Sequence, residues 1–220
     1  MNCFAHALPY LDQPEFMVGC CVPDWLSAVD RKCRVRERRA REFDGDVDPF
    51  LAAVAQGVVQ HHQDDHWFHQ SAAFAQLSLQ FAVEIRECFN GETGFRAGFL
   101  GHIIVELLLD SFLTDQFPGQ LEVFYQRVGQ VCPQRLQASI NRFATRPTEK
   151  LVFYIERFLD IRFLFDYLND PGLLFRLNNV LKRVKLQPLD DKILTWLPSA
   201  RVRVYERAAD LLCNYPLKLD

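Results

Sequence analysis

Apolar residues recur every three or four positions along most of the chain, which is the period of an amphipathic helix. Pro, Gly or Asn bounds each apolar segment, and no alternating apolar–polar run with a hairpin turn occurs. The pattern therefore predicts an all-α protein. The predicted helices span 49–70, 71–88, 95–117, 121–131, 133–144, 149–168, 171–184, 190–196 and 199–213.

Local signals refine some helix ends. Asp48-Pro49 predicts a capped helix start, and Asn90-Gly91 predicts a helix end. A short helix is predicted over 4–11. Asp24, which follows Pro23 in apolar surroundings, is interpreted either as a helix N-cap, which the local signal favours, or as a buried ligand.

The chain of 220 residues shows no repeat, low-complexity segment or convincing linker. A hydrophobic fraction of 49% is typical of a globular protein with a substantial core. We therefore predict one all-helical domain over 1–220, a single-domain helical bundle.

Charge and cysteine content limit the possible functions. A net charge of −3 indicates no general attraction to nucleic acid or to an anionic membrane. Seven scattered cysteines without a CxxC pair favour reduced thiols over a disulfide framework. Because a signal peptide and an uninterrupted apolar run of about 20 residues are also missing, we predict a cytoplasmic protein without a membrane span.

Four of the six histidines lie between Gly57 and Gln70. In a helix, His61, Asp65 and His69 share one face. The alternative for this stripe is an exposed polar face, and the equally helical register through His62, His66 and His69 would be its solvated edge.

A second stripe, with His102, Glu106 and Asp110, lies in a strongly apolar segment. An unpaired carboxylate there is costly unless it has a partner, a proton or a metal. Histidine and carboxylate ligands together predict a divalent metal, either Mn, Fe, Zn or Mg.

Several motifs resemble those of bacterial acyl carrier protein phosphodiesterases. The opening MNCFAHAL, which contains His6, is followed by Gly19 and Asp24 as in that family. Gly57, His61, Asp65 and His69 match its Gly-x-x-x-His-x-x-x-Asp-x-x-x-Asp motif with histidine in the last place. The segment ELLLDSFL, 106–113, resembles its Asp-x-x-x-Asp-His-Phe-Leu motif, with Glu106 for the first Asp and Ser111 for the His.

The resemblance implies a divergent HD-domain-like fold, all-α and with a divalent metal. The family hydrolyses the phosphodiester between phosphopantetheine and a carrier-protein serine. By matching position, the resemblance nominates Asp24, His61, Asp65 and Asp110 as metal-site residues and adds His6 from the opening motif. It covers the first half, so 1–117 is predicted to carry the site and 118–220 to complete the helical fold. The strict His-Asp dipeptide of HD proteins is missing, and carrier-protein recognition is not transferred.

The working hypothesis is a metal-dependent phosphoesterase that acts on a phosphorylated small molecule or a phosphopantetheine-type substrate. His69, His102 and Glu106 would be catalytic, as further ligands, ligand supports or a proton shuttle. Arginines of 31–41, or Arg162, Arg176 and Arg183, would neutralise the phosphate. The alternatives are a non-catalytic helical binding or scaffold protein that retains the fold and an HD-type di-iron oxygenase. The oligomeric state is not predicted.

Overall fold

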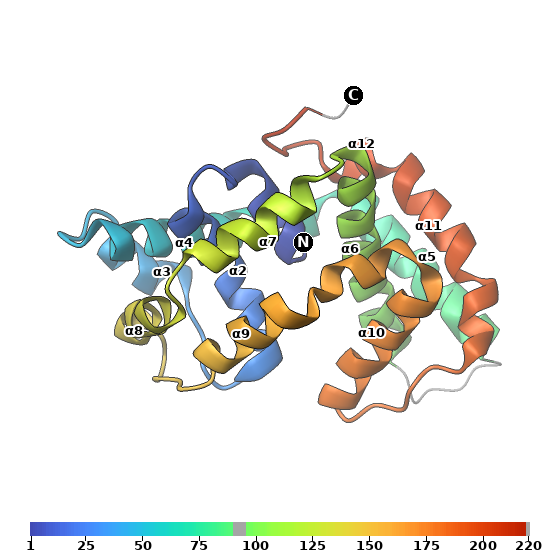
Figure 1. Cartoon of the computed structure of the whole chain (residues 1–220). Helices are drawn as coiled ribbons and strands as arrows, with labels where there is room; N and C mark the ends of the chain where they lie inside the picture. The colour runs from blue at the N-terminus through green and yellow to red at the C-terminus, as the bar shows by residue number, and fades with distance from the viewer. Residues whose placement is uncertain (90–95, 219–220) are drawn as a thin grey trace. The chain divides into compact units, whose positions relative to one another are not determined.

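The computed structural model describes residues 1–89 and 96–218 (Figure 1). Within these ranges the secondary structure consists of α-helices and short 3-10 helices, without a β-strand. The all-α prediction is confirmed. The likeness to HD domains and the prediction of one domain over 1–220 stay predictions. Contacts divide the chain into two compact units. One, which we call the His61 unit, comprises 2–66 and 118–162, and the other, the His102 unit, comprises Met1, 67–117 and 163–220.

The His61 unit is built around an aromatic core. Its elements are α1 (Cys3–Ala7), η1 (Leu8–Tyr10), α2 (Pro14–Val29), α3 (Glu37–Ala40), η2 (Arg41–Phe43), most of α4 (Pro49–Gln70), α7 (Gln120–Gln130), α8 (Pro133–Phe143) and α9 (Leu151–Ile161). The ring of Phe158 lies 5.3 Å from that of Trp25 and 6.0 Å from that of Phe124, while Phe4 lies 5.8 Å from Phe124. These nearly inaccessible rings join α1, α2, α7 and α9.

The favoured interpretation of Asp24 as a helix N-cap is wrong. Helix α2 continues through Pro23, so Asp24 lies inside it and is not an N-cap. An interior proline costs about 3 kcal/mol. The flanking Val22 and Trp25 are buried, so tertiary packing outweighs the local preference to end the helix. Helix α4 begins as predicted, because the Asp48 carboxylate accepts a hydrogen bond from the Phe50 amide at 3.0 Å.

The His102 unit is organised around two long helices that pack against each other, α5 (Ala72–Cys88) and α6 (Ala97–Gln116) (Figure 1). The remaining elements are η3 (Phe163–Leu168), α10 (Asp170–Arg183), η4 (Asp191–Thr195), α11 (Leu197–Glu206), α12 (Ala208–Leu211) and the end of α4. Helix α6 is the one described helix long and apolar enough to span a membrane, and 56% of its most apolar window is buried within the protein. That burial is typical of a core helix, and the cytoplasmic location stays a prediction.

Two predicted helices are wrong in their extent. The segment 149–168 breaks at Arg162, which adopts a left-handed φ of 52° and ends α9, and η3 follows. The segment 199–213 breaks at Arg207 between α11 and α12. Neither break carries a Gly or Pro signal, so the local pattern could not reveal it. The predicted Asn90-Gly91 helix end lies outside the described residues.

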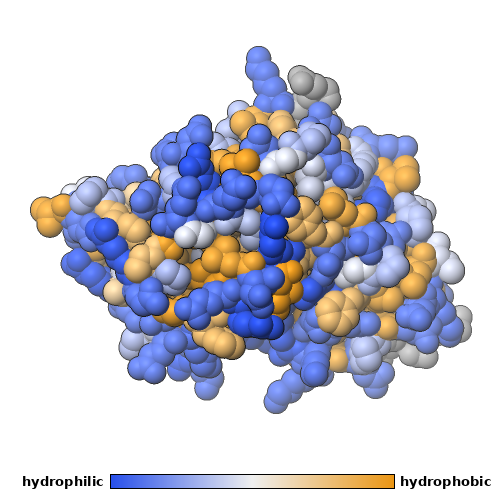
Figure 2. All heavy atoms as spheres, viewed as in Figure 1, coloured by the Kyte–Doolittle hydropathy of each residue, from blue (hydrophilic) through white to orange (hydrophobic). Residues whose placement is uncertain are grey.

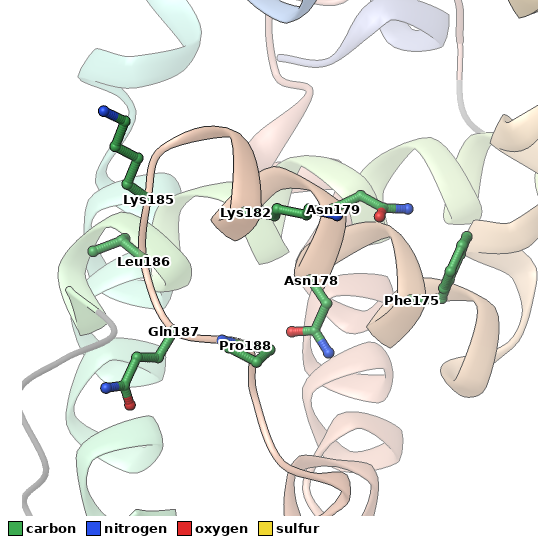
Figure 3. A pocket seen from close by; sticks show the side chains of 8 residues that line it. All are labelled: Phe175, Asn178, Asn179, Lys182, Lys185, Leu186, Gln187 and Pro188. Carbon is green, nitrogen blue, oxygen red and sulfur yellow. The ribbon is translucent and has the colours of Figure 1, made fainter.

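A cavity of about 490 Å³ lies on the His102 unit (Figure 3). Its polar lining is two lysines and three side-chain amides, without an imidazole, carboxylate or thiol. The lining residues are Phe175, Asn178, Asn179, Lys182, Lys185, Leu186, Gln187 and Pro188. This lining does not supply the ligands of a hydrolytic metal site.

Hydrophobic residues are interspersed with hydrophilic ones over the face in Figure 2. Exposed apolar side chains alone therefore do not mark a site.

Candidate metal centre

Helices α1 and α4 bring His6, His61 and Asp65 together in the His61 unit. One candidate ligand atom from each of these residues lies within 4.8 Å of the others. The Nε2 atoms of His6 and His61 each lie 3.3 Å from a different Asp65 oxygen. Both histidines are almost inaccessible, whereas the Asp65 side chain is 29% exposed. The Asp65 carboxylate is therefore partly exposed to solvent, whereas the two imidazoles that it contacts are buried.

A close crossing of α2 and α4 sets the position of His61. A Cβ on Gly57 would lie 2.0 Å from the Phe16 carbonyl oxygen, and one on Gly19 would lie 2.4 Å from the Val54 carbonyl oxygen. Only glycine permits this approach of the two backbones. One turn after Gly57, His61 Nδ1 donates a hydrogen bond to the Cys20 carbonyl oxygen at 2.8 Å.

The protonation state of His61 indicates whether the cluster can hold a cation. Burial and the nearby charge of His6 lower the pKa of His61 to about 4, so its ring is neutral at pH 7. Since its single N–H, on Nδ1, is used by Cys20, its Nε2 carries a lone pair. That lone pair faces a negative Asp65 oxygen at 3.3 Å. Two acceptors in this position call for a cation between them, and the residues present therefore fit a metal ion.

His6 lies on the other side of Asp65 and likewise has an oxygen beside its Nδ1. Its Nδ1 lies 3.3 Å from an Asp64 oxygen, and Gln60 donates to the other Asp64 oxygen at 2.8 Å. His6 Nε2 is buried and has no aligned hydrogen-bond partner within the described ranges. Burial opposes protonation, but Asp64 and Asp65 outweigh it and raise the pKa of His6 to about 9. Burial likewise raises the pKa of Asp65, but its contacts with His6 and His61 hold it far below its usual range.

A cavity of about 320 Å³ opens beside the cluster. His61 and Asp65 line it together with Asp24, which is the environment that the ligand interpretation of Asp24 requires. Arg34 and Arg36 line it as well. A site that combines imidazole, carboxylate and guanidinium groups can bind a cation and an anion side by side.

The two arginines share one side of an extended segment. From 33 to 36 buried and exposed residues alternate, with Cys33 and Val35 inside and Arg34 and Arg36 outside. The Val35 carbonyl oxygen accepts a hydrogen bond from His62 Nε2 at 2.9 Å. His62 thus fastens this arginine segment (33–36) to α4. His66 is exposed.

Asp30 anchors the start of the arginine segment. Its carboxylate accepts hydrogen bonds from the guanidinium of Arg146 at 2.6 Å and the hydroxyl of Thr148 at 3.1 Å. The Arg34 amide donates to Thr145 Oγ1 at 3.0 Å, and the Thr145 amide donates back to the Arg34 carbonyl at 2.8 Å. These contacts hold the arginine segment against the loop that precedes α9.

Replacing Asp30 by asparagine is expected to lower stability in a pH-dependent way. Arg146 lowers the pKa of Asp30, with help from Thr148 and against the effect of burial. The carboxylate therefore stabilises the fold above its unfolded pKa of about 4, and this contribution is lost as the pH falls through the lower folded value. Because Arg146 is 46% exposed, we expect a loss of about 1 kcal/mol at pH 7 and a melting temperature roughly 2–4 °C lower. Thermal melts of both proteins at pH 7, 5 and 3 test this, and a difference that persists undiminished at pH 3 would contradict it.

The three predicted catalytic residues form a second cluster, in the His102 unit. Glu106 Oε1 lies 2.9 Å from His69 Nε2 and 3.2 Å from His102 Nε2. The α-amino nitrogen of Met1 lies 3.3 Å from the same oxygen. Burial raises the pKa of Glu106, but this amino group and the two histidines hold it well below its usual range.

The structure thus divides most of the predicted site residues between two clusters. His6, His61 and Asp65 form one, with Asp24 in the adjoining cavity, and His69 does not join them despite sharing their helical stripe. Asp110 is buried in α6 of the His102 unit and belongs to neither cluster of the described residues.

Sequence reasoning missed the supports behind the cluster. Asp64 lies behind His6, and the Cys20 carbonyl lies behind His61. Asp64 had a visible signal, since it adjoins Asp65 in a histidine-rich helix. The Cys20 carbonyl had none, because any residue supplies one.

The prediction that His, Asp and Glu groups can hold a metal is confirmed at this general level, whereas the identity of the metal stays a prediction. No protein-family model, no curated protein and no solved structure matches the chain.

Proposed function

We propose that this protein is a metal-dependent phosphoester hydrolase whose centre is formed by His6, His61 and Asp65. One observation carries the proposal. Both imidazoles have an oxygen acceptor beside Nδ1, and both direct Nε2 toward the same carboxylate. Metal-binding histidines in proteins typically have this arrangement, because the outer acceptor selects the tautomer and orients the ring.

Different residues of the chain would bind the metal and the phosphate. His6, His61 and Asp65 would hold a divalent ion, with Asp24 at the edge of the same cavity. Such an ion would polarise a phosphoryl oxygen and activate water for attack. Arg34 and Arg36 would bind the remaining phosphate oxygens, for which the planar guanidinium is well suited.

The cavity also bears on the substrate class. Its volume of about 320 Å³ is at the small end of ligand pockets. This size favours a phosphorylated small molecule or the end of an extended arm, such as a phosphopantetheine-type group. A bulky folded substrate would have to present its phosphoester on a protruding segment.

The resemblance to acyl carrier protein phosphodiesterases supports the same proposal. Its first two motifs contain Gly19 and Gly57, which allow the α2–α4 crossing, and His6, His61 and Asp65, which form the cluster. One packing arrangement thus accounts for five of the shared positions. We therefore propose hydrolysis of a phosphodiester ahead of a phosphomonoester.

Hydrolysis of bis(p-nitrophenyl) phosphate tests the proposal. We expect turnover that requires Mn²⁺, Fe²⁺, Zn²⁺ or Mg²⁺ and stops with a chelator. A charge-assisted hydrogen bond is worth about 1.5–3 kcal/mol, so Arg36→Gln should raise KM by roughly tenfold or more while metal content stays unchanged.

Arg38→Gln is the matched control, because Arg38 is exposed in the same basic stretch but does not line the cavity. Equal KM values for the two variants would remove Arg36 from substrate binding. A metal-loaded protein inactive on both diesters and monoesters would overturn the proposed function.

A further inference from the structure

We propose that His69, His102 and Glu106 form a separate binding site for one divalent transition-metal ion in the His102 unit. The candidate ligand atoms lie within 4.8 Å of one another. Ligand atoms about 2.1 Å from a shared cation lie roughly 3–3.5 Å apart. The distance of 3.2 Å from Glu106 Oε1 to His102 Nε2 lies within this range, and that of 2.9 Å to His69 Nε2 lies just below it.

The backbone beside the cluster is tightly packed. A Cβ on Gly101 would lie 2.4 Å from the Ser78 carbonyl oxygen, so α5 and α6 are in close contact directly before His102. His102 and Glu106 are one turn apart on α6, and their separation is therefore set by the helix itself.

The aromatic ring of Phe74 restricts the orientation of both imidazoles. The ring of Phe74 lies 5.0 Å from that of His69 and 4.8 Å from that of His102. The two imidazoles are themselves 4.8 Å apart. Because Phe74 packs against both rings, the ligands have little freedom to turn away before a cation arrives.

The donor set indicates which cations fit. Two imidazoles and one carboxylate suit Zn²⁺, Co²⁺, Fe²⁺ or Mn²⁺, whereas Mg²⁺ and Ca²⁺ prefer oxygen ligands alone. His69 and His102 are 32% and 39% exposed, so an ion can reach the cluster from solvent. Three protein ligands leave coordination positions for water or for a small ligand.

The amino group of Met1 lies 3.3 Å from Glu106 Oε1 and competes with a cation for this oxygen. A carboxylate has two oxygens and about four lone-pair positions. Glu106 can therefore keep its contact with the amine while it binds a cation.

The test uses the Asp65→Asn protein, in which the His61 unit lacks its shared carboxylate and the second cluster is intact. With Co²⁺ as the probe, equilibrium dialysis and the visible spectrum should report one bound ion. Adding Glu106→Gln or His102→Ala should weaken its binding by about 100-fold or more. Zn²⁺ at about 100 times its Kd should raise the melting temperature by roughly 5–10 °C only when the second cluster is intact.

Asp65→Asn combined with His66→Ala is the control, because His66 is an exposed histidine on the same helix as His69. Undiminished Co²⁺ binding after Glu106→Gln and His102→Ala would overturn the site, as would a folded Asp65→Asn protein that binds no Co²⁺. Either result would mean that the three side chains form a hydrogen-bonded cluster only. The outcome is independent of the proposed function, which would fail separately if the wild-type protein showed no metal-dependent hydrolysis.

Discussion

Asp65→Asn is expected to remove the metal from the His6–His61 cluster and to abolish hydrolysis. Asp65 offers an oxygen to each imidazole at 3.3 Å, so the two imidazoles share its carboxylate. Loss of a group that merely supports a ligand costs 10–100-fold in metal affinity, so loss of this charge should cost about 100-fold or more. Asparagine preserves the shape, and far-UV circular dichroism should therefore remain unchanged. Metal content after gel filtration and the rate of diester hydrolysis provide the measurements.

His61→Ala should have the same effect, because it removes the neutral imidazole that Cys20 orients. His66→Ala provides the matched control, as an exposed histidine one residue after Asp65. We expect His66→Ala to retain full metal content and activity. If Asp65→Asn and His66→Ala behaved alike, α4 would present an ordinary polar face and the proposed centre would be wrong.

Gly57→Ala is expected to cause the largest loss of stability for the smallest chemical change. The added Cβ would lie 2.0 Å from the Phe16 carbonyl oxygen and 2.9 Å from the Cys20 amide nitrogen. Both atoms belong to backbone, which cannot rotate away as a side chain can. Overpacking of this kind costs about 1–3 kcal/mol or more, and we expect the top of that range. A fall in melting temperature of roughly 6–12 °C should follow.

The same substitution should also weaken metal binding. Separating α2 from α4 moves the Cys20 carbonyl away from His61 Nδ1, which lies 2.8 Å from it. Gly129→Ala is the control, since a Cβ there meets no atom within 4 Å and Gly129 lies in α7 of the same unit. Alanine is the better helix former by about 1 kcal/mol, so this variant should be as stable as the wild type or slightly more so. A Gly57→Ala protein with an unchanged melting temperature would show that the α2–α4 crossing is not tightly packed.

The local pattern was sufficient wherever the cause was itself local. Asp48 and Pro49 predict the start of α4, because a capping carboxylate and a fixed proline φ act within one turn. The pairing of His61 with Asp65 follows from i,i+4 geometry alone. The same rule pairs His102 with Glu106.

Local rules misled where packing was stronger. Pro23 reads as a boundary and Asp24 as a cap, yet α2 continues because the residues around them are buried. Arg162 carries no terminating signal, yet it adopts a left-handed conformation and ends α9. His69 lies on the same stripe as His61 and Asp65, but it contacts the carboxylate of Glu106 on another helix.

The sequence by itself therefore determined the helical class, most helix positions and the side chains able to hold a metal. Only the tertiary structure decided how those side chains group, which placed His6 beside Asp65 and aligned Arg34 and Arg36 with the same cavity. The physical reason is range. Helical spacing and capping act over a few residues, whereas the grouping depends on where two distant helices cross. Gly19 and Gly57 allow that crossing in the His61 unit, but their role becomes visible only when the two backbones are seen in contact.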